Sequence, residues 1–358
     1  MDRDTLLKIL DLARWAPSGD NTQPWRFALE ADGGLTVYGH DTRLEILYDF
    51  EGHASHMAHG ALLETLHIAA SGFGYAAHAS IESAPPDDAP RYRVRFEAFA
   101  GGPHPLLPFV ERRTVQRRPM RTTPLTAAQR GALAAAAGPD AELRFFEGFA
   151  ARARVARLLW DNARIRLTCP EAYPVHKSII EWGARYSRDR IPEQAVGVDP
   201  LTARLMQWVM GSWSRVEFFN RYLMGTVLPR IQLDVLPALG CAAHILLCPT
   251  RPPQSLADWV SLGRAMQRIW LTAAQQGLHL QPQMTPVIFR WYAQAGQRFS
   301  ASPGLHEQAR ALAANLEDLA GASPGDPMGF FARVGVCAAP RSRSTRLEVR
   351  DLLVAPSV

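Results

Sequence analysis

The sequence contains only four cysteines, and no two of them form a CxxC motif. They are Cys169, Cys241, Cys248 and Cys337, and most stand in apolar surroundings. A zinc site needs several thiolates or imidazoles at short spacing, and a disulfide framework is typical of small secreted chains. Because the chain shows neither pattern, we expect reduced, buried thiols, no bound metal and a cytoplasmic protein.

The chain also lacks a long uninterrupted apolar run. The longest, residues 235–248, is broken by Pro237, Gly240 and His244, whereas a transmembrane helix needs about 20 apolar residues. The N-terminus shows no basic segment followed by an apolar stretch, as a secretory signal would. We therefore expect no membrane partner, and we interpret residues 241–248 as a buried strand.

Neither charge nor glycine pattern points to nucleic acid or to a firmly held nicotinamide. The formal net charge of +5 comes from basic residues spread along the chain, with arginine clusters at residues 112–121 and 341–350. One bound phosphate explains these clusters as well as a polyanion does, so we expect no nucleic-acid partner. No GxGxxG follows a strand, and no Ser-His-Asp or Cys-His signature occurs.

Three histidines, His53, His56 and His59, recur at a spacing that places two on one helical face. No cysteine or paired carboxylate completes a metal ligand set around them. We therefore interpret them as structural histidines near the start of a helix.

A repeat is the first informative feature that is present. The length of 358 residues exceeds the usual size of one core, so we expect two domains or one with a large insertion. Residues 60–74 align without gaps on residues 263–277, and each segment has apolar residues at helical spacing and ends at a glycine. The alternative is a chance likeness between alanine-rich helices.

A second pair of segments supports the repeat. An amphipathic helix over residues 4–15 leads through a turn into a strand at residues 25–29, and residues 126–137 lead in the same way into residues 143–146. Glycine and proline at residues 101–105 mark a seam. We predict a first half over 1–104 and a second half over 105–358.

The second half contains more than a copy of the first. Residues from about 152 to 237 carry several helical patterns rich in aromatic side chains. An extra packed helical layer explains them as well as a functional element does. Our hypothesis is a cap over the active site, because an insertion of this size needs something to cover.

The segment Ala16-Pro17-Ser18-Gly19-Asp20-Asn21-Thr22-Gln23-Pro24-Trp25 suits the ring of a flavin. Its two prolines stiffen the chain, Gly19 lets the backbone approach a ligand, and Ser18, Asn21 and Gln23 supply donors and acceptors. By itself the segment could equally be a helix end followed by a polar turn.

Three motifs together carry a resemblance to a known family. Ala-Pro-Ser-x-x-Asn-x-Gln-Pro-Trp resembles the signature of the FMN-dependent nitroreductases. Residues 112–119, Arg-Arg-Thr-Val-Gln-Arg-Arg-Pro, resemble that family's Arg-Ser-x-Arg phosphate arm, and residues 340–348 are similar to its basic closing segment. The turn precedes the arm here, so the chain resembles the tandem, pseudo-dimeric Acg-like proteins of this family.

The resemblance implies an α+β fold, with a mixed sheet flanked by helices in each of two fused half-domains around one pseudo-dimer interface, plus the helical cap. It implies that the flavin ring is lined from the first half by Pro17, Ser18, Gly19, Asn21 and Gln23. It implies that the phosphate is held from the second half by Arg113, Thr114 and Arg117, with Arg341 and either Arg343 or Arg346. Gln116 stands where the family has a second basic residue, which leaves open whether Arg117 or Arg118 substitutes. The resemblance also implies that the backbone of Met284 and Thr285 lies near flavin N5, and the Glu-Gly pair often found there is absent from this sequence.

The second half lacks the Asn-x-Gln-Pro-Trp turn, so the resemblance implies one complete FMN site per chain. The implied function is an oxidoreductase that passes electrons from NAD(P)H or an organic donor through N5 to a small organic acceptor, with no side chain as a dedicated acid or base. Alternatives are a flavin-sequestering protein without turnover, an FMN-dependent dehydrogenase of a peptide-derived substrate, and a scaffolding pseudo-enzyme. A fused chain is expected to be a monomer or a homodimer.

Overall fold

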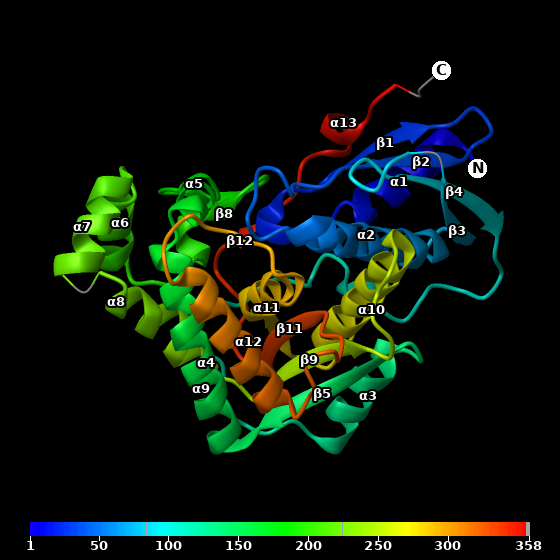
Figure 1. The fold of residues 1–358 in the computed structure, drawn as a ribbon. Coiled ribbons are helices and arrows are strands. Elements are labelled where there is room, and N and C mark those ends of the chain that lie inside the picture. The colour runs from blue at the N-terminus through cyan, green and yellow to red at the C-terminus, as the bar shows by residue number, and fades with distance from the viewer. Residues whose placement is uncertain (84, 224, 356–358) are drawn as a thin grey trace.

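The computed structural model describes residues 1–83, 85–223 and 225–355. It contains two four-stranded sheets with two long helices between them, and a group of shorter helices to one side (Figure 1). The first unit consists of α1 (Arg3–Ala13), β1 (Trp25–Leu29), β2 (Leu35–Gly39), α2 (His53–Ser71), β3 (Tyr75–Ile81) and β4 (Arg91–Ala98). The second consists of α3 (Ala127–Ala137), β5 (Ala141–Glu147), β9 (Ala243–Pro249), α10 (Leu256–Gln275), β10 (His279–Pro282) and β11 (Phe330–Gly335).

The two sheets have the same strand order. The first is ordered β1-β2-β4-β3, and the second, taken from its β5 edge, is ordered β5-β9-β11-β10. We expected mixed sheets, with both parallel and antiparallel neighbours. This expectation is wrong, because neighbouring strands in both sheets pair in antiparallel ladders. At the edges of these two sheets, the described residues form two single parallel bridges, Phe27 with Leu353 and Val115 with Leu280. A short turn joins β1 to β2 and forces the reversal of direction.

Helix ends follow their sequence signals. Asp2 caps α1 by accepting a hydrogen bond from the Thr5 backbone N–H at 2.9 Å. Ser255 and Asp258 form a capping box at the start of α10. Residues 60–71 and 263–275 of the repeat lie in α2 and α10. The predicted strand over residues 25–29 is also confirmed.

The two long helices cross at the glycines that the repeat aligns. A Cβ built on Gly60 would overlap the carbonyl oxygen of Val260, and one built on Gly263 would overlap that of Met57. Met57 and Val260 are themselves equivalent in the same alignment. The crossing therefore requires the absence of a side chain at both positions, so that the two backbones can touch.

Polar contacts along this crossing are also related by the repeat. Gln267 Nε2 donates to Thr65 Oγ1 at 2.9 Å, and Arg268 lies 3.4 Å from the carboxylate of Glu64. Glu64 aligns with Gln267, and Thr65 aligns with Arg268. Equivalent positions thus contact each other reciprocally, which is the contact pattern of a two-fold interface.

The connections between equivalent strands differ between the units. Residues 30–34 join β1 to β2, whereas residues 148–242 separate β5 from β9. This insertion begins earlier than predicted and contains α4 (Gly148–Thr168), α5 (Tyr173–Ser178), β6 (Ile180–Glu181), β7 (Tyr186–Ser187), β8 (Ile191–Pro192), α6 (Pro200–Val209), α7 (Trp213–Tyr222), α8 (Val227–Arg230) and α9 (Leu236–Leu239). We call this insertion the cap.

Two further helices, α11 (Thr285–Ala295) and α12 (Leu305–Ala320), connect β10 to β11. The chain then returns to the first unit through β12 (Arg343–Ser344) and α13 (Val349–Leu352). Backbone N–H of Val354 donates to Phe27 O at 2.9 Å. The C-terminal segment therefore ties the two units together.

None of the helices in the described part of the chain is long and apolar enough to cross a membrane. All four cysteines are free, and Cys169, Cys241 and Cys248 are buried.

Candidate functional site

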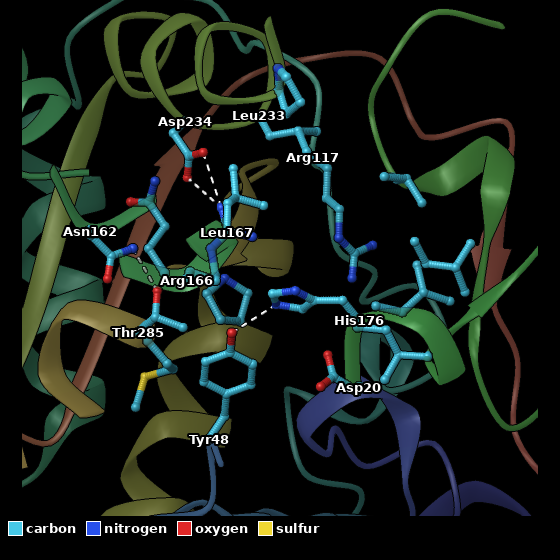
Figure 2. Close-up of a pocket in the computed structure, with 18 of the residues that line it drawn as sticks. Asp20, Tyr48, Arg117, Asn162, Arg166, Leu167, His176, Leu233, Asp234 and Thr285 are labelled. Carbon is cyan, nitrogen blue, oxygen red and sulfur yellow. Dashed lines mark hydrogen bonds and ion pairs between the residues drawn. The ribbon is translucent and has the colours of Figure 1, made fainter. Parts of the chain in front are cut away.

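A cavity of about 620 Å³ lies where the two units and the cap meet (Figure 2). This volume is in the range of small-molecule sites. Pro17, Ser18, Gly19 and Asp20 line it from the first unit, and Gln281 to Thr285 line it from the second. Most of the remaining lining is apolar and comes from the cap.

The turn between α1 and β1 holds a strained backbone. Asp20, Asn21 and Gln23 have φ values of 48°, 67° and 50°, in the left-handed region that only glycine adopts freely. The Ser18 hydroxyl accepts a hydrogen bond from the Gln23 backbone N–H at 2.9 Å. Strain of this kind persists only where the surroundings fix it, and it is frequent at ligand sites.

Two of the predicted ring residues of this turn lie beside the cavity instead of lining it. Gln23 is fully buried, and its side chain donates to Arg188 O and Asn21 O and accepts from Leu347 N–H. Asn21 Nδ2 donates to Thr345 O at 3.3 Å. Both side chains tie the turn to the cap and the C-terminal segment, and thereby position Pro17 to Asp20.

The start of α11 forms the opposite wall. Met284 and Thr285 line the cavity, as do the three preceding residues. Asn162 Nδ2, from α4 of the cap, donates to Thr285 Oγ1 at 2.8 Å. The first N–H groups of a helix have no intrahelical acceptor, so this wall offers backbone donors to a ligand.

Three of the predicted phosphate residues come together beside the cavity, around the end of α1. Arg343 stacks over Trp15 at 4.6 Å, Arg113 stacks over Trp270 at 4.5 Å, and Arg346 Nε donates to Ala16 O at 3.0 Å. None of the three arginines pairs with a carboxylate among the described residues. Trp270 and Pro17 line the cavity, so the cluster adjoins it.

The electrostatics of this arginine cluster favour an anion. Burial, followed by repulsion from neighbouring arginines, lowers the pKa of Arg113 well below its usual value and that of Arg346 to about 9. Four buried N–H groups have no acceptor in the described structure: Nε of Arg113, Nε of Arg343 and the indole nitrogens of Trp15 and Trp270. Buried cations and donors of this kind are stabilised by an acceptor-rich anion such as a phosphate.

The other residues predicted for the phosphate lie elsewhere. Arg117 lines the cavity itself, and Arg341 is exposed. Gln116 is buried, and its amide donates to Ala338 O at 3.2 Å. Thr114 is half-buried and does not line the cavity. Consecutive residues of an extended arm point to different sides, which is why residues 113–117 do not act as one group.

The sequence analysis did not identify several polar groups of the cavity. Tyr48 Oη lies 2.7 Å from His176 Nε2, and Arg166 pairs with Asp234 at 3.1 Å. Figure 2 shows Asp20 and Arg117 directed into the same space from opposite sides. Burial raises the pKa of Asp20, and Arg117 and Arg166 oppose this shift. His176, Arg166 and Asp234 belong to the cap, and no motif marks them. Arg117, by contrast, was expected at the phosphate, and Asp20 stands within the Ala16 to Trp25 segment.

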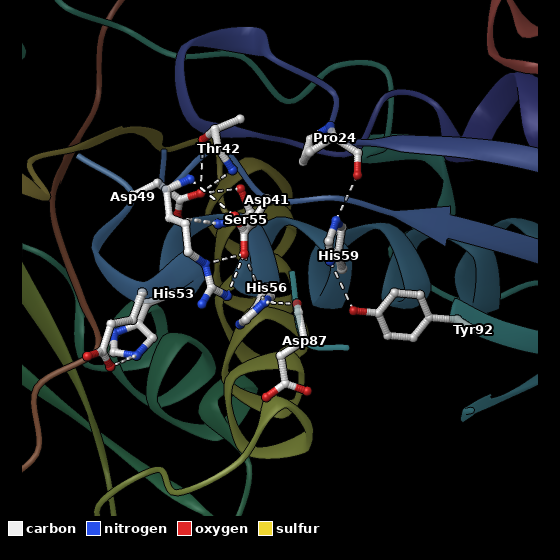
Figure 3. A network of polar contacts seen from close by, with 12 residues as sticks. Pro24, Asp41, Thr42, Asp49, His53, Ser55, His56, His59, Asp87 and Tyr92 are labelled. Carbon is white, nitrogen blue, oxygen red and sulfur yellow. Dashed lines mark hydrogen bonds and ion pairs between the residues drawn. The ribbon is translucent and has the colours of Figure 1, made fainter. Parts of the chain in front are cut away.

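The three histidines of α2 form a polar network beneath the turn (Figure 3). His59 is fully buried between Pro24 O at 2.7 Å and Tyr92 Oη at 2.9 Å. His56 Nε2 bonds with Asp87 O at 2.8 Å, and His53 stacks on Trp259. Each ring has its own partner, and the described residues contain no cluster suited to a metal ion.

Comparison with known proteins gives no match to any protein-family model. The chain is similar to the uncharacterized protein MT1398 of Mycobacterium tuberculosis, with 26% identity over 329 residues, covering 85% of this chain and 42% of that protein. The chain thus spans about two fifths of the length of this curated relative.

Solved structures similar to the chain are nitroreductase-like. The FMN-dependent nitroreductase NfnB of Mycobacterium smegmatis, in complex with NADPH, has 14% identity and a TM-score of 0.38, covering 68% of this chain and 94% of its own. A nitroreductase of Bacteroides fragilis with bound FMN has 10% identity and a TM-score of 0.32, covering 66% and 89%. A nitroreductase-like protein of Bacillus cereus has 10% identity and a TM-score of 0.36, covering 71% and 97%.

Proposed function

We propose that the chain is an FMN-dependent oxidoreductase with one flavin site, shared by two fused half-domains. The observation that carries the proposal is the position of the arginine cluster, which has no carboxylate partner among the described residues, next to a cavity that the Pro17 to Asp20 turn lines. The flavin ring would occupy the cavity, and its phosphate would be held by Arg113, Arg343 and Arg346. The four unpaired donors of this cluster fit the oxygen atoms of a phosphate.

The cavity groups fit the polar edge of the ring as well. The pyrimidine edge of a flavin presents an N–H donor between two carbonyl acceptors. The Asp20 carboxylate suits the donor and the Arg117 guanidinium suits an acceptor. Positive charge from Arg117 would also favour the reduced, anionic flavin, so we assign Arg117 to the ring and not to the phosphate.

A bound flavin would supply hydride transfer in both directions, while the protein binds, orients and excludes water. Pro17 and Gly19 would present the first wall, and the backbone at Met284 and Thr285 the second. The donor would be NAD(P)H or another organic reductant, and the acceptor a small organic molecule. The reciprocal contacts of α2 and α10 support an origin of the chain by fusion, in the tandem Acg-like manner, and a monomeric protein.

The first test measures cofactor binding by the flavin-free protein. We expect titration with FMN to saturate at one equivalent per chain. The complex should absorb at about 450 nm, which is a property of oxidised flavins. Arg346→Gln should weaken FMN binding about 10- to 100-fold, because a charge-assisted hydrogen bond contributes about 1.5–3 kcal/mol. Two equivalents per chain, or no binding, would contradict the proposal.

Riboflavin provides the matched ligand, because it lacks only the phosphate. Its affinity should be the same in Arg346→Gln as in the unaltered protein. The exposed Arg341→Gln is the matched variant and should bind FMN normally. Equal losses of FMN and riboflavin affinity in Arg346→Gln would show that the cluster does not hold the phosphate.

A second candidate function is flavin sequestration without turnover. The extent of the cap favours it, since cap residues supply most of the apolar cavity lining. Anaerobic mixing of the FMN-loaded protein with NADPH or NADH separates the two functions. An oxidoreductase that uses these donors loses its absorbance near about 450 nm, whereas a sequestering protein keeps it.

A further inference from the structure

Tyr48 and His176 form a polar pair that joins the first unit to the cap inside the cavity. Tyr48 precedes α2, and His176 lies on α5. The phenol oxygen is 2.7 Å from His176 Nε2, and the two rings stack with centroids 5.7 Å apart. Both residues line the cavity together with Asp20 and Thr285, which belong to its two proposed flavin walls (Figure 2).

The loop that carries Tyr48 is held firmly. The Asp49 carboxylate accepts hydrogen bonds from the backbone N–H and the hydroxyl of Thr42 and from the backbone N–H and the hydroxyl of Ser55 (Figure 3). Tyr292 donates to Leu47 O at 3.0 Å on the other side. The phenol is therefore presented to the cavity in a fixed position, as proton transfer requires.

Both members of the pair are neutral near pH 7. Burial lowers the pKa of His176 to about 3, with a further contribution from Arg166, and burial raises the pKa of Tyr48 above its usual value. His176 bonds to Tyr48 through Nε2, and Nδ1 is the second nitrogen of its ring. A neutral imidazole can release a proton at one nitrogen while it gains one at the other.

We propose that Tyr48 and His176 deliver the proton that an organic acceptor takes up together with a hydride, so that the cap contributes to catalysis. This rests on the proposed flavin function, which supplies the hydride. It replaces the expectation that no side chain acts as an acid or base. Tyr48 is the catalytic residue, because its hydroxyl faces the cavity, and His176 acts through it.

Reduction of a nitro compound shows how protons and electrons balance. The nitro group gains one hydride and one proton, one N–O bond breaks, and the products are a nitroso compound and water. The Tyr48 O–H bond breaks to supply the proton. His176 Nε2–H then returns a proton to the phenolate oxygen, while Nδ1 takes a proton from solvent water. This restores the phenol and leaves His176 as its other tautomer. A proton shift between the two ring nitrogens through water completes the cycle.

The test compares two acceptors of electrons. The FMN-loaded protein is reduced anaerobically with dithionite and mixed with nitrofurazone, which needs a proton, or with ferricyanide, which takes electrons alone. Tyr48→Phe and His176→Gln should slow oxidation by nitrofurazone about 100-fold or more, in the range of general acid catalysis. Oxidation by ferricyanide should stay within about twofold of the unaltered protein.

Tyr173→Phe is the matched control, since it removes a phenol hydroxyl from α5, the helix that carries His176, but outside the cavity. It should leave both reactions unchanged. Normal nitrofurazone rates in Tyr48→Phe would overturn the inference, as would a loss found only in Asp20→Asn, the rival acid. Absence of flavin binding, or failure of both acceptors in the unaltered protein, would instead contradict the proposed function.

A readout apart from turnover tests the pair itself. In the flavin-free protein, ¹⁵N NMR of the His176 ring should show a neutral imidazole from about pH 5 to 8, given its lowered pKa. The Nε2 signal should move in Tyr48→Phe and remain in place in Tyr173→Phe. If the His176 ring titrates near pH 6.5 and its Nε2 signal is unchanged in Tyr48→Phe, the pair does not exist.

Discussion

The two units share strand order and helix crossing but differ in the segments that connect their elements. In the first, α1 leads into β1 through the strained Ser18 to Pro24 turn, and a short turn joins β1 to β2. In the second, three residues separate α3 from β5, and the cap separates β5 from β9. The cavity needs the turn of one unit and the cap of the other. The repeated elements supply the scaffold, and the unrepeated segments supply the site.

The largest effect is expected where the units are most alike. Gly263→Ala places a methyl group against the carbonyl of Met57, and Gly60→Ala does the same against Val260. Both obstacles are backbone atoms that cannot rotate away. We expect either variant to lose about 3 kcal/mol or more of unfolding free energy, measured by urea denaturation, or to be insoluble. Stability within about 0.5 kcal/mol of the unaltered protein would disprove the close crossing.

The next largest effect compares the turn of the first unit with the start of α3 in the second. Gln23→Ala removes three hydrogen bonds of a fully buried side chain, one within the first turn, one to the cap and one to the C-terminal segment. It should cost about 3 kcal/mol, since it leaves buried groups unpaired. Gln129 of α3, which caps an exposed helix, is the counterpart, and Gln129→Ala should cost about 1 kcal/mol or less. Equal costs would mean that the first turn is no better anchored than the second unit's helix.

Acid should destabilise both units through one fully buried histidine in each. Burial lowers the pKa of His59 to about 3 and that of His244 to about 4, whereas an unfolded histidine titrates near pH 6.5. Because the folded pKa is depressed, the stability is present above about pH 6.5 and is lost as pH falls toward these values.

Each histidine should contribute a slope of about 1.4 kcal/mol per pH unit between about pH 6 and 4. Urea denaturation across this range measures the slope. His59→Gln and His244→Gln should each reduce this slope by about 1.4 kcal/mol per pH unit, the contribution of one proton. An unchanged slope in both variants would assign acid sensitivity to other groups.

The smallest effect is a gain. Gly131 lies within α3, and a Cβ there meets nothing within 4 Å. Gly131→Ala should stabilise the protein by about 0.5–1 kcal/mol, because alanine loses less backbone entropy in a helix. It is also the control for the crossing glycines. A loss of stability would show that α3 is not the exposed helix described.

Much of the scaffold could be predicted from periodicity. Residues 60–74 and 263–277 have helical spacing, and residues 25–29 form the strand expected. The direction of the sheet ladders could not be predicted, because antiparallel order depends on which strands become neighbours. The cap starts at Gly148, a few residues before the predicted bound of about 152, because α4 follows β5 directly.

The sequence alone indicated the segments proposed for the candidate site: the Pro17 turn, the arginines of residues 112–121 and 341–350, and residues 284–285. Only the tertiary structure decided which of these residues lie together and which lie apart. It grouped Arg113, Arg343 and Arg346 around Trp15 and left Arg341 exposed. It committed Gln23 to backbone partners, and it brought His176 to Tyr48 across 128 residues. Motif spacing specifies residue type along the chain, whereas burial, pairing and pKa depend on neighbours that only folding supplies.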